Sequence, residues 1–332
     1  MRRTLEWLAV CLLGFVVRRL GDGAAACIGR WIGRAAFRLL RRRRRVALRN
    51  LEAAYPGAPS GLAPDASAGL SPDERRALAR RTFEHFACVV VEILRFPLLD
   101  KESCVSRVEF AGLEHMRAAL AEGKGAIFCA GHFGNWELAA LALGYAGFPM
   151  TMLTRPLDNP RLERLLACYR AASGNRLLHK HASLRHLMRD LRDGQAVTVV
   201  MDQHFGDANA VVVNFMGRPA ATTPAVALLS LKTGAPVVMV FPIALGGGRY
   251  RVLCEPGPPA ALTGDRAHDE AALTVAMTRR IEHYVRKHPE QWLWMHERWR
   301  VPARPSLGKS AAPEKEAEAP DKPSEAAGVV RG

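Results

Sequence analysis

Two patterns of apolar positions recur along the chain. Short, nearly continuous apolar runs bounded by Gly, Pro or polar residues predict strands, and the longest of these runs are typical of strands buried on both faces of a sheet. The predicted strands cover residues 108–110, 126–130, 149–154, 196–201, 237–244 and 250–254. Gly246–Gly248 joins the last two and predicts a hairpin.

Longer stretches with apolar residues at steps of three and four predict helices between these runs. Ser71-Pro-Asp-Glu74 and Asn159-Pro160 are typical helix starts, with a capping residue followed by Pro at the first helical position. Helices are expected at residues 113–120, 138–145, 160–172, 183–192, 224–231 and 265–287. The alternation predicts one mixed α/β domain over residues 31–302, with helices on both faces of its sheet.

The first 30 residues form a separate prediction, an N-terminal membrane anchor. Residues 5–17 are apolar except for Glu6, but this run is shorter than the roughly 20 residues that a spanning helix needs. A cleaved signal peptide ending near Ala24–Ala26 is one interpretation, although Arg18, Arg19 and Asp22 interrupt the approach to that site. A short tilted span and a helix lying in the interface are the others, and the sequence favours an uncleaved anchor.

The charge of the chain is concentrated beside this segment. The formal net charge is +15, and residues 1–50 hold thirteen arginines against Glu6 and Asp22. Residues 25–40 predict an amphipathic basic helix on a membrane surface, and the five arginines of 41–45 follow it. Arginines without interleaved aromatic residues favour anionic lipid over nucleic acid.

The remaining composition adds three expectations. Seven scattered cysteines without a Cys-x-x-Cys pair favour a reducing compartment over a disulfide framework or zinc site. Residues 57–69 are rich in Pro, Gly, Ala and Ser and predict a surface loop, and residues 303–332 predict a disordered tail. Trp292, Trp294 and Trp299, interleaved with Arg298 and Arg300, predict a membrane interface or a lid over a site.

The strongest candidate chemistry lies in the turn between the strand 126–130 and the helix after it. His132 is placed in the loop, Glu137 in the first helical turn, and Asn135 at the expected N-cap. A histidine can act as a general base near neutral pH, and a carboxylate can fix its tautomer. Gly131 and Gly134 leave room for a substrate beside the ring. A histidine satisfied by a helix N-terminus, with Glu137 complementing the helix dipole, is the alternative.

Further polar residues follow the later strands. Arg155 and Asp202 each stand at a strand end, with Gln203 next to Asp202, and we expect Arg155, Gln203 and Asn135 to contact a substrate. A carboxylate in this position can orient a base, hold a hydroxyl or cap a turn, and the sequence does not choose among these roles. Gly217-Arg218-Pro219 precedes a helix whose expected caps are Thr222 or Thr223, and its backbone amides could face a lipid phosphate. His179, His181 and His186 lack an acid or cysteine at ligand spacing, so no metal site and no cofactor are expected.

These residues resemble a known family. His132, four intervening residues and Glu137 match the His-x4-acid motif of the glycerolipid acyltransferase superfamily. The sequence of residues 131–137, Gly-His-Phe-Gly-Asn-Trp-Glu, is similar to the form of this motif in the branch that acylates lipid A late in its biosynthesis. The likeness continues in order through residues 154–160, 201–206, 213–223 and 288–300.

The resemblance implies a glycerolipid-acyltransferase-like fold and an O-acyltransferase attached to the cytoplasmic face of the inner membrane. It implies transfer from acyl carrier protein to a lipid A precursor, with Glu137 holding His132, and it adds Arg170 and an acid at Asp202 to the site. Arg170, together with Arg155, would stabilise an oxyanion or hold a phosphate. The alternatives are an acyltransferase for another glycolipid or phospholipid, one that uses acyl-CoA, and a basic peripheral membrane-binding protein without catalysis.

Overall fold

The computed structural model describes residues 2–56, 69–179, 183–259 and 262–300. The expected loop 57–69, apart from Gly69, and the expected disordered tail 303–332 lie outside these residues, as does His181 of the histidine cluster.

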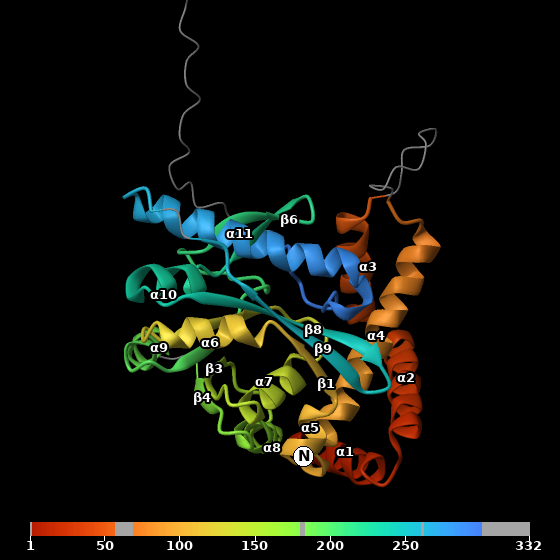
Figure 1. Ribbon diagram of the computed structural model, residues 1–332. Helices are drawn as coiled ribbons and strands as arrows, with labels where there is room; N and C mark the ends of the chain where they lie inside the picture. Colours follow the sequence, from red (N-terminus) through yellow and green to blue (C-terminus); the bar gives the residue numbers. More distant parts are fainter. Residues whose placement is uncertain (1, 57–68, 180–182, 260–261, 301–332) are drawn as a thin grey trace, which may run out of the picture. The chain divides into compact units, whose positions relative to one another are not determined.

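A mixed seven-stranded sheet forms the centre of the fold, in the order β1-β9-β8-β2-β5-β3-β4 (Figure 1). Its strands are β1 (Val108–Ala111), β2 (Ala126–Ala130), β3 (Met150–Thr154), β4 (Arg176–His179), β5 (Ala196–Val200), β8 (Val237–Gly246) and β9 (Arg249–Pro256). Within this sheet, as far as the structure describes it, only β8 and β9 pair antiparallel, through the expected glycine turn. Strands β8, β2, β5, β3 and β4 therefore run in one direction, so their carboxyl ends meet at one edge, where open α/β sheets bind ligands.

Helices cover both faces of this sheet, as the sequence predicted. Successive β2 side chains point to opposite faces: Ile127 and Cys129 belong to one apolar core, Ala126 and Phe128 to another. The first core is covered by α9 (Ser183–Arg192), α10 (Ala225–Thr233) and α11 (Arg266–Lys287). The second is covered by α5 (Lys101–Val105), α6 (Leu113–Ala121), α7 (Trp136–Tyr145) and α8 (Pro160–Ala171).

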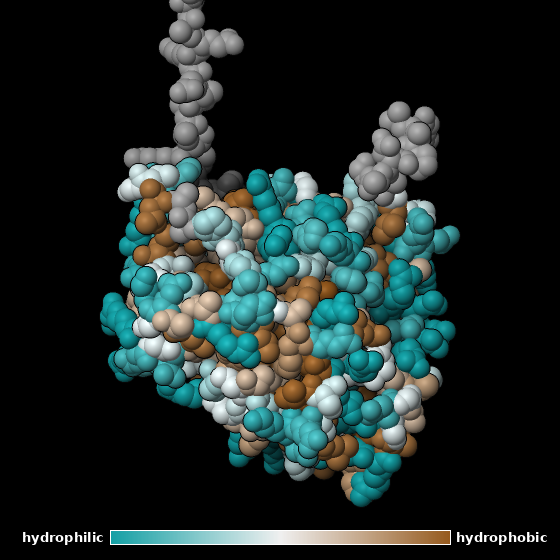
Figure 2. Space-filling view, viewed as in Figure 1, coloured by the Kyte–Doolittle hydropathy of each residue, from teal (hydrophilic) through white to brown (hydrophobic). Residues whose placement is uncertain are grey.

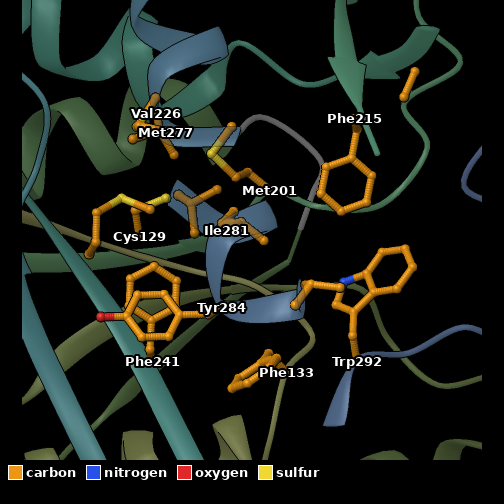
Figure 3. Packing of buried hydrophobic residues seen from close by; sticks show 14 of the residues in the cluster. Cys129, Phe133, Met201, Phe215, Val226, Phe241, Met277, Ile281, Tyr284 and Trp292 are labelled. Atoms are coloured by element: carbon orange, nitrogen blue, oxygen red, sulfur yellow. The ribbon is translucent and has the colours of Figure 1, made fainter. Parts of the chain in front are cut away.

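Aromatic stacking fixes α11 on the first face. Phe241 of β8 and Tyr284 of α11 lie with ring centroids 4.0 Å apart, and Figure 3 shows the two rings overlapping next to Ile281. Figure 1 places α11 on one side of β8 and β9, with α7 and α8 on the other. The carboxyl edge of β2 and β5 is thus held between two packed helical layers.

The helix starts read from the sequence are confirmed by their capping bonds. Ser71 and Glu74 form a capping box at α4 (Pro72–Leu94), and the side chains of Asn135, Asn159 and Asp265 accept backbone N–H bonds at α7, α8 and α11. Each cap satisfies backbone donors that the first turn leaves without a partner.

The segment around Gly217 differs from its expected form. Residues 211–222 make a separate antiparallel hairpin, β6 (Val211–Phe215) and β7 (Arg218–Thr222), with positive φ angles at Met216 and Gly217 in the turn. Gly217, Arg218 and Pro219 are exposed at this turn, a whole strand away from α10, so they do not present backbone amides at its N-terminus. Thr223 accepts a bond from the N–H of Ala225, while Pro224 occupies the N-cap.

Three helices precede α4, namely α1 (Arg2–Val17), α2 (Asp22–Leu39) and α3 (Arg41–Ala54). Val17 and Ala25 pack with Val91 and Leu94 of α4 in a small third core. In the described part of the chain, none of the helices combines the length and apolar character needed to cross a bilayer. The N-terminal anchor stays a prediction.

Glycines let α2 approach α4 closely. A Cβ on Gly33 would lie 2.4 Å from the Cα of Glu84 and 2.6 Å from the carbonyl oxygen of Phe83, so backbone would have to move. We expect Gly33→Ala to lower the free energy of unfolding by roughly 1–3 kcal/mol in denaturant titrations, because overpacking outweighs the gain in helix propensity. Gly23→Ala is the matched control, since a Cβ there meets nothing within 4 Å. Equal effects of the two substitutions would contradict this packing argument.

Candidate active site

His132 and Asp202 lie side by side at the carboxyl edge of the sheet. Ala130 of β2 pairs with Val200 of β5, and each polar residue comes two positions after its strand residue. Asp202 Oδ1 lies 2.7 Å from Nδ1 of the His132 ring, and Asp202 Oδ2 accepts the backbone N–H of His132 at 2.7 Å. The loop after β2 and the end of β5 are thereby joined through one carboxylate.

Asp202 is held in its ionised form. Burial alone would raise its pKa, but the charge of the His132 ring and the hydrogen bonds from His132 and Trp292 outweigh burial and keep the pKa of Asp202 below its usual value. An ionised carboxylate only accepts hydrogen bonds, so the ring proton of neutral His132 sits on Nδ1. The lone pair of Nε2 is then available for a substrate proton.

Trp292 completes this arrangement from the far end of the chain. Its indole Nε1–H donates to Asp202 Oδ2 at 2.7 Å, and the backbone N–H of Leu293 donates to the carbonyl of His132. Figure 3 shows the Trp292 ring in the buried core below Phe215. The expectation of a membrane interface or lid is wrong for Trp292, Trp294 and Arg298, which are at most 1% exposed.

Glu137 has a different partner from the one expected. Its Oε2 accepts from Arg170 Nε at 2.8 Å and its Oε1 from Arg170 Nη2 at 2.5 Å, a bidentate ion pair between α7 and α8. The structure therefore corrects the interpretation that Glu137 holds the imidazole of His132, because Asp202 occupies that position. Arg170 Nη1 has no hydrogen bond to any described residue.

The loop that carries His132 requires glycine at position 134. Gly134 has a φ of 56°, and a Cβ there would lie 1.7 Å from the carbonyl oxygen of Pro242. Its N–H donates to the carbonyl of Gln291, and its own carbonyl accepts a hydrogen bond from Nε2 of His85 on α4. Any side chain at this position would displace the loop and with it His132.

Asn135 serves the loop rather than a substrate. Its side-chain oxygen caps α7 at Leu138, its Nδ2 donates to Glu92 at 2.8 Å, and the residue is 0% exposed. Glu92 also accepts from the Tyr250 hydroxyl. With both ends of the amide occupied and no exposed surface, Asn135 makes no contact with the cleft.

A cleft of about 650 Å³ opens in front of His132. It brings together several of the expected site residues, namely His132, Glu137, Arg155, Arg170 and Gln203. Asp202 lies behind His132, 4% exposed, whereas Gly217, Arg218 and Pro219 belong to the β6–β7 turn and do not line the cleft. In the ranges that the structure describes, no three His, Cys, Asp or Glu side chains gather as a metal ligand set.

The cleft also contains His296, to which the sequence analysis gave no role. His296 lines the cleft and accepts the backbone N–H of His204 at 3.2 Å, while the buried Arg298 donates to the carbonyls of Gln203 and Ala221. Apart from the likeness of residues 288–300 to the acyltransferase branch, nothing in the sequence indicated these contacts, since the segment has no helical or strand periodicity.

Two partly buried histidines predict how stability depends on pH. Burial lowers the pKa of both His85 and His296 to about 4. The unfolded chain takes up protons near pH 6.5 while the folded chain does not, so the free energy of unfolding should fall as pH drops from about 6.5 to about 4. We expect a loss of roughly 1–3 kcal/mol per histidine, measured by denaturant titration at several pH values. His85→Gln should make the free energy of unfolding depend less steeply on pH between about 6.5 and 4. An unchanged slope in this variant would contradict the role assigned to His85.

Comparisons with known proteins agree with the resemblance found in the sequence. Residues 1–301 match the family model described as bacterial lipid A biosynthesis acyltransferase. The chain is 28% identical to a lipid A biosynthesis acyltransferase of Haemophilus influenzae over 293 residues, 87% of this chain and 85% of that protein.

Two further relatives cover similar lengths. The lipid A biosynthesis lauroyltransferase of Escherichia coli is 28% identical, over 89% of each chain. The phosphatidylinositol mannoside acyltransferase of Mycobacterium tuberculosis is 26% identical, over 88% of this chain and 86% of its own length. Since the family model spans nearly the whole described chain, this protein belongs to the bacterial lipid A biosynthesis acyltransferases.

Proposed function

We propose that this enzyme transfers a fatty acyl chain from the thioester of acyl carrier protein to a hydroxyl of a lipid A precursor. The observation that carries the mechanism is the His132–Asp202 pair at the mouth of the cleft. Nε2 of His132 takes the hydroxyl proton as the hydroxyl oxygen attacks the thioester carbonyl, and Asp202 stabilises the imidazolium that forms. The C–S bond then breaks and the leaving sulfur takes up that proton, which yields an ester and a free thiol without an acyl-enzyme.

The oxyanion of this reaction needs a positive partner. Arg170 lines the cleft, and the guanidinium keeps Nη1 free while Glu137 holds its other side. This partly buried ion pair thus fixes the guanidinium in advance, which is the condition for electrostatic stabilisation of a developing charge. Glu137 would act in catalysis through Arg170.

The cleft also suits an acyl chain. Residues of β3, of β5 and of the loop after β5 line one wall, among them the partly exposed apolar residues Leu153, Val200 and Phe205. The acceptor is proposed from the relatives, two of which are named for lipid A biosynthesis. The phosphatidylinositol mannoside relative supports a second candidate, another membrane glycolipid, and acyl-CoA is the second candidate for the donor.

Reconstitution tests the reaction. The purified full-length chain, in detergent, would be given a lipid A precursor with either acyl carrier protein thioester or acyl-CoA, and the lipid analysed by mass spectrometry. A mass increase of one acyl group with the carrier protein thioester supports the proposal. In cells, loss of that group on gene deletion and its return on complementation would assign the acceptor. Acylation of a different glycolipid alone would refute the lipid A assignment.

Membrane attachment is proposed to occur through α1 lying in the interface. Leu5, Leu8, Leu12 and Phe15 form an exposed apolar stripe on this helix, between 49% and 65% exposed. Arg2, Arg3 and Arg19 flank the stripe. In Figure 2 apolar side chains reach the surface at the lower edge, where Figure 1 places α1. An apolar stripe flanked by arginines suits the headgroup region of anionic lipid.

Vesicle binding checks this attachment. We expect Leu8→Glu with Leu12→Glu to weaken co-sedimentation with anionic phospholipid vesicles by roughly tenfold or more, because two apolar side chains are no longer buried. Leu245→Glu with Leu262→Glu is the matched control, since both leucines are exposed but belong to other segments, the end of β8 and the approach to α11. Equal loss in the two double variants would contradict a specific role of α1.

A further inference from the structure

Arginines from three parts of the chain face the cleft, and of these the sequence analysis expected only Arg155 at the site. Arg42 and Arg43 come from α3, Arg155 follows β3, and Arg300 ends the described segment after α11. The sequence placed the whole run 41–45 on a lipid surface. The helix instead divides the run, because Arg42 and Arg43 line the cleft that contains His132, whereas Arg41 and Arg45 do not.

These arginines carry positive charge that the protein does not neutralise. Five arginines and two glutamates line the cleft, which leaves an excess of three positive charges. Arg170 is already paired with Glu137. The other glutamate, Glu297, is shared between Arg300 at 2.9 Å and Arg42 at 3.8 Å.

The two remaining guanidinium groups have few partners. Among the residues that the structure describes, Arg43 donates a single long bond, 3.4 Å, to the carbonyl of Met295. Arg155 forms no hydrogen bond or ion pair with any described residue. Both side chains therefore keep donors free inside a cleft that already holds a net positive charge.

We infer that Arg42, Arg43, Arg155 and Arg300 form an arginine rim that binds a phosphate group of the substrate. Guanidinium groups match phosphate oxygens through paired N–H donors, and arginine is favoured where such planar recognition is needed. The rim shares its cleft with His132, so the anion must belong to a molecule whose reacting group reaches that ring. This distinguishes it from the general attraction of a basic helix to anionic lipid.

The inference rests on the proposed acyl transfer and makes it more specific. A phosphate can come from the head of the acceptor or from the pantetheine arm of the thioester donor, and both present the same chemistry to the rim. If the phosphate is on the acceptor, the rim determines which hydroxyl lies at Nε2 of His132, because a fixed anion fixes the register of the rest of the molecule.

Binding without turnover tests the rim. The full-length chain, in detergent and without acyl donor, would be titrated with a bisphosphorylated lipid A precursor and with the same lipid after phosphatase treatment. A separate titration would use 4′-phosphopantetheine. The variants are Arg155→Gln and the double variant Arg42→Gln with Arg43→Gln. Arg41→Gln with Arg45→Gln is the matched control, since it removes the same charge from the same helix outside the cleft.

We expect each rim variant to weaken binding of one phosphorylated probe by roughly tenfold, the loss typical of a hydrogen bond to a charged group. The control should not change it, and the dephosphorylated lipid should bind wild type and variants alike. Weakening with the lipid assigns the phosphate to the acceptor, and weakening with phosphopantetheine assigns it to the donor. Equal affinities for the phosphorylated and dephosphorylated lipid together with unchanged phosphopantetheine binding, or equal losses in rim and control variants, would overturn the inference.

The outcome is separate from that of the proposed function. If the rim binds phosphate but the enzyme acylates no hydroxyl, the proposed reaction fails and the rim stands. If phosphorylated and dephosphorylated acceptors are acylated with the same KM and neither probe depends on the rim, the rim fails and the reaction stands.

Discussion

Replacing His132 by alanine is expected to lower kcat for acyl transfer by roughly 10³-fold, the range in which a positioned general base contributes. The hydroxyl would then have to lose its proton to water while it attacks the thioester. KM for both substrates should change little, because the cleft is lined by many other residues. Single-turnover formation of the acylated lipid, followed by mass spectrometry, measures the effect.

Two measurements and one further variant serve as controls for His132→Ala. The His132 side chain is 21% exposed and meets the Trp136 ring edge-on with centroids 5.1 Å apart, so its truncation should leave the core in place. Binding of the phosphorylated lipid and the unfolding midpoint should match wild type. His268→Ala, an exposed histidine on α11, should keep full activity. Near-normal turnover by His132→Ala would refute the assignment of His132 as the general base.

Asp202→Asn is expected to lower kcat by roughly 10³-fold or more, although the side chain keeps its size. The carboxylate accepts three bonds, from His132 Nδ1, from the His132 backbone N–H and from Trp292 Nε1. An amide offers only one oxygen for these three donors, so the imidazole is free to take the other tautomer. The imidazolium would also lose its counter-charge. The variant should therefore change the pH at which kcat rises and falls, in addition to lowering the maximum of kcat.

Glu137→Gln is the informative comparison, because the motif by itself made Glu137 the partner of His132. This substitution leaves the His132–Asp202 pair in place but removes the charge opposite the partly buried guanidinium of Arg170. It should lower the free energy of unfolding by roughly 1–3 kcal/mol, less than for a fully buried pair because Arg170 faces the cleft, and reduce kcat without moving the pH profile. A pH profile altered by Glu137→Gln and untouched by Asp202→Asn would reverse the two assignments.

Local features of the sequence were sufficient to predict most of the helices and strands. The strands β2 and β5 are continuous or nearly continuous apolar runs because both of their faces are covered, and a run of that kind is visible without knowing what covers it. The starts of α4, α7, α8 and α11 were equally visible, because each cap lies within three residues of the N–H it accepts. The family resemblance, which rests on ordered motifs, was confirmed by the family model over residues 1–301.

The short strands β4, β6 and β7 were not predicted from the sequence. Strand β4 begins with Arg176, ends with His179 and has no buried residue, since it lies at the edge of the sheet. The β6–β7 hairpin was interpreted as a turn before a helix, because its strands are only half buried and contain Pro219. Such segments become strands by pairing with a partner, and their own residues indicate pairing only weakly.

The partners within the site were decided by the tertiary structure alone. His132 lies five positions from Glu137 and seventy from Asp202, yet the parallel pairing of β2 with β5 puts Asp202 at its ring, and the first turn of α7 directs Glu137 to α8. The same holds for the arginines of α3, which are uniform in sequence and are divided by the helix into those inside the cleft and those outside it. Sequence lists which groups are present, whereas strand register and helix packing choose which of them share a hydrogen bond or a cavity.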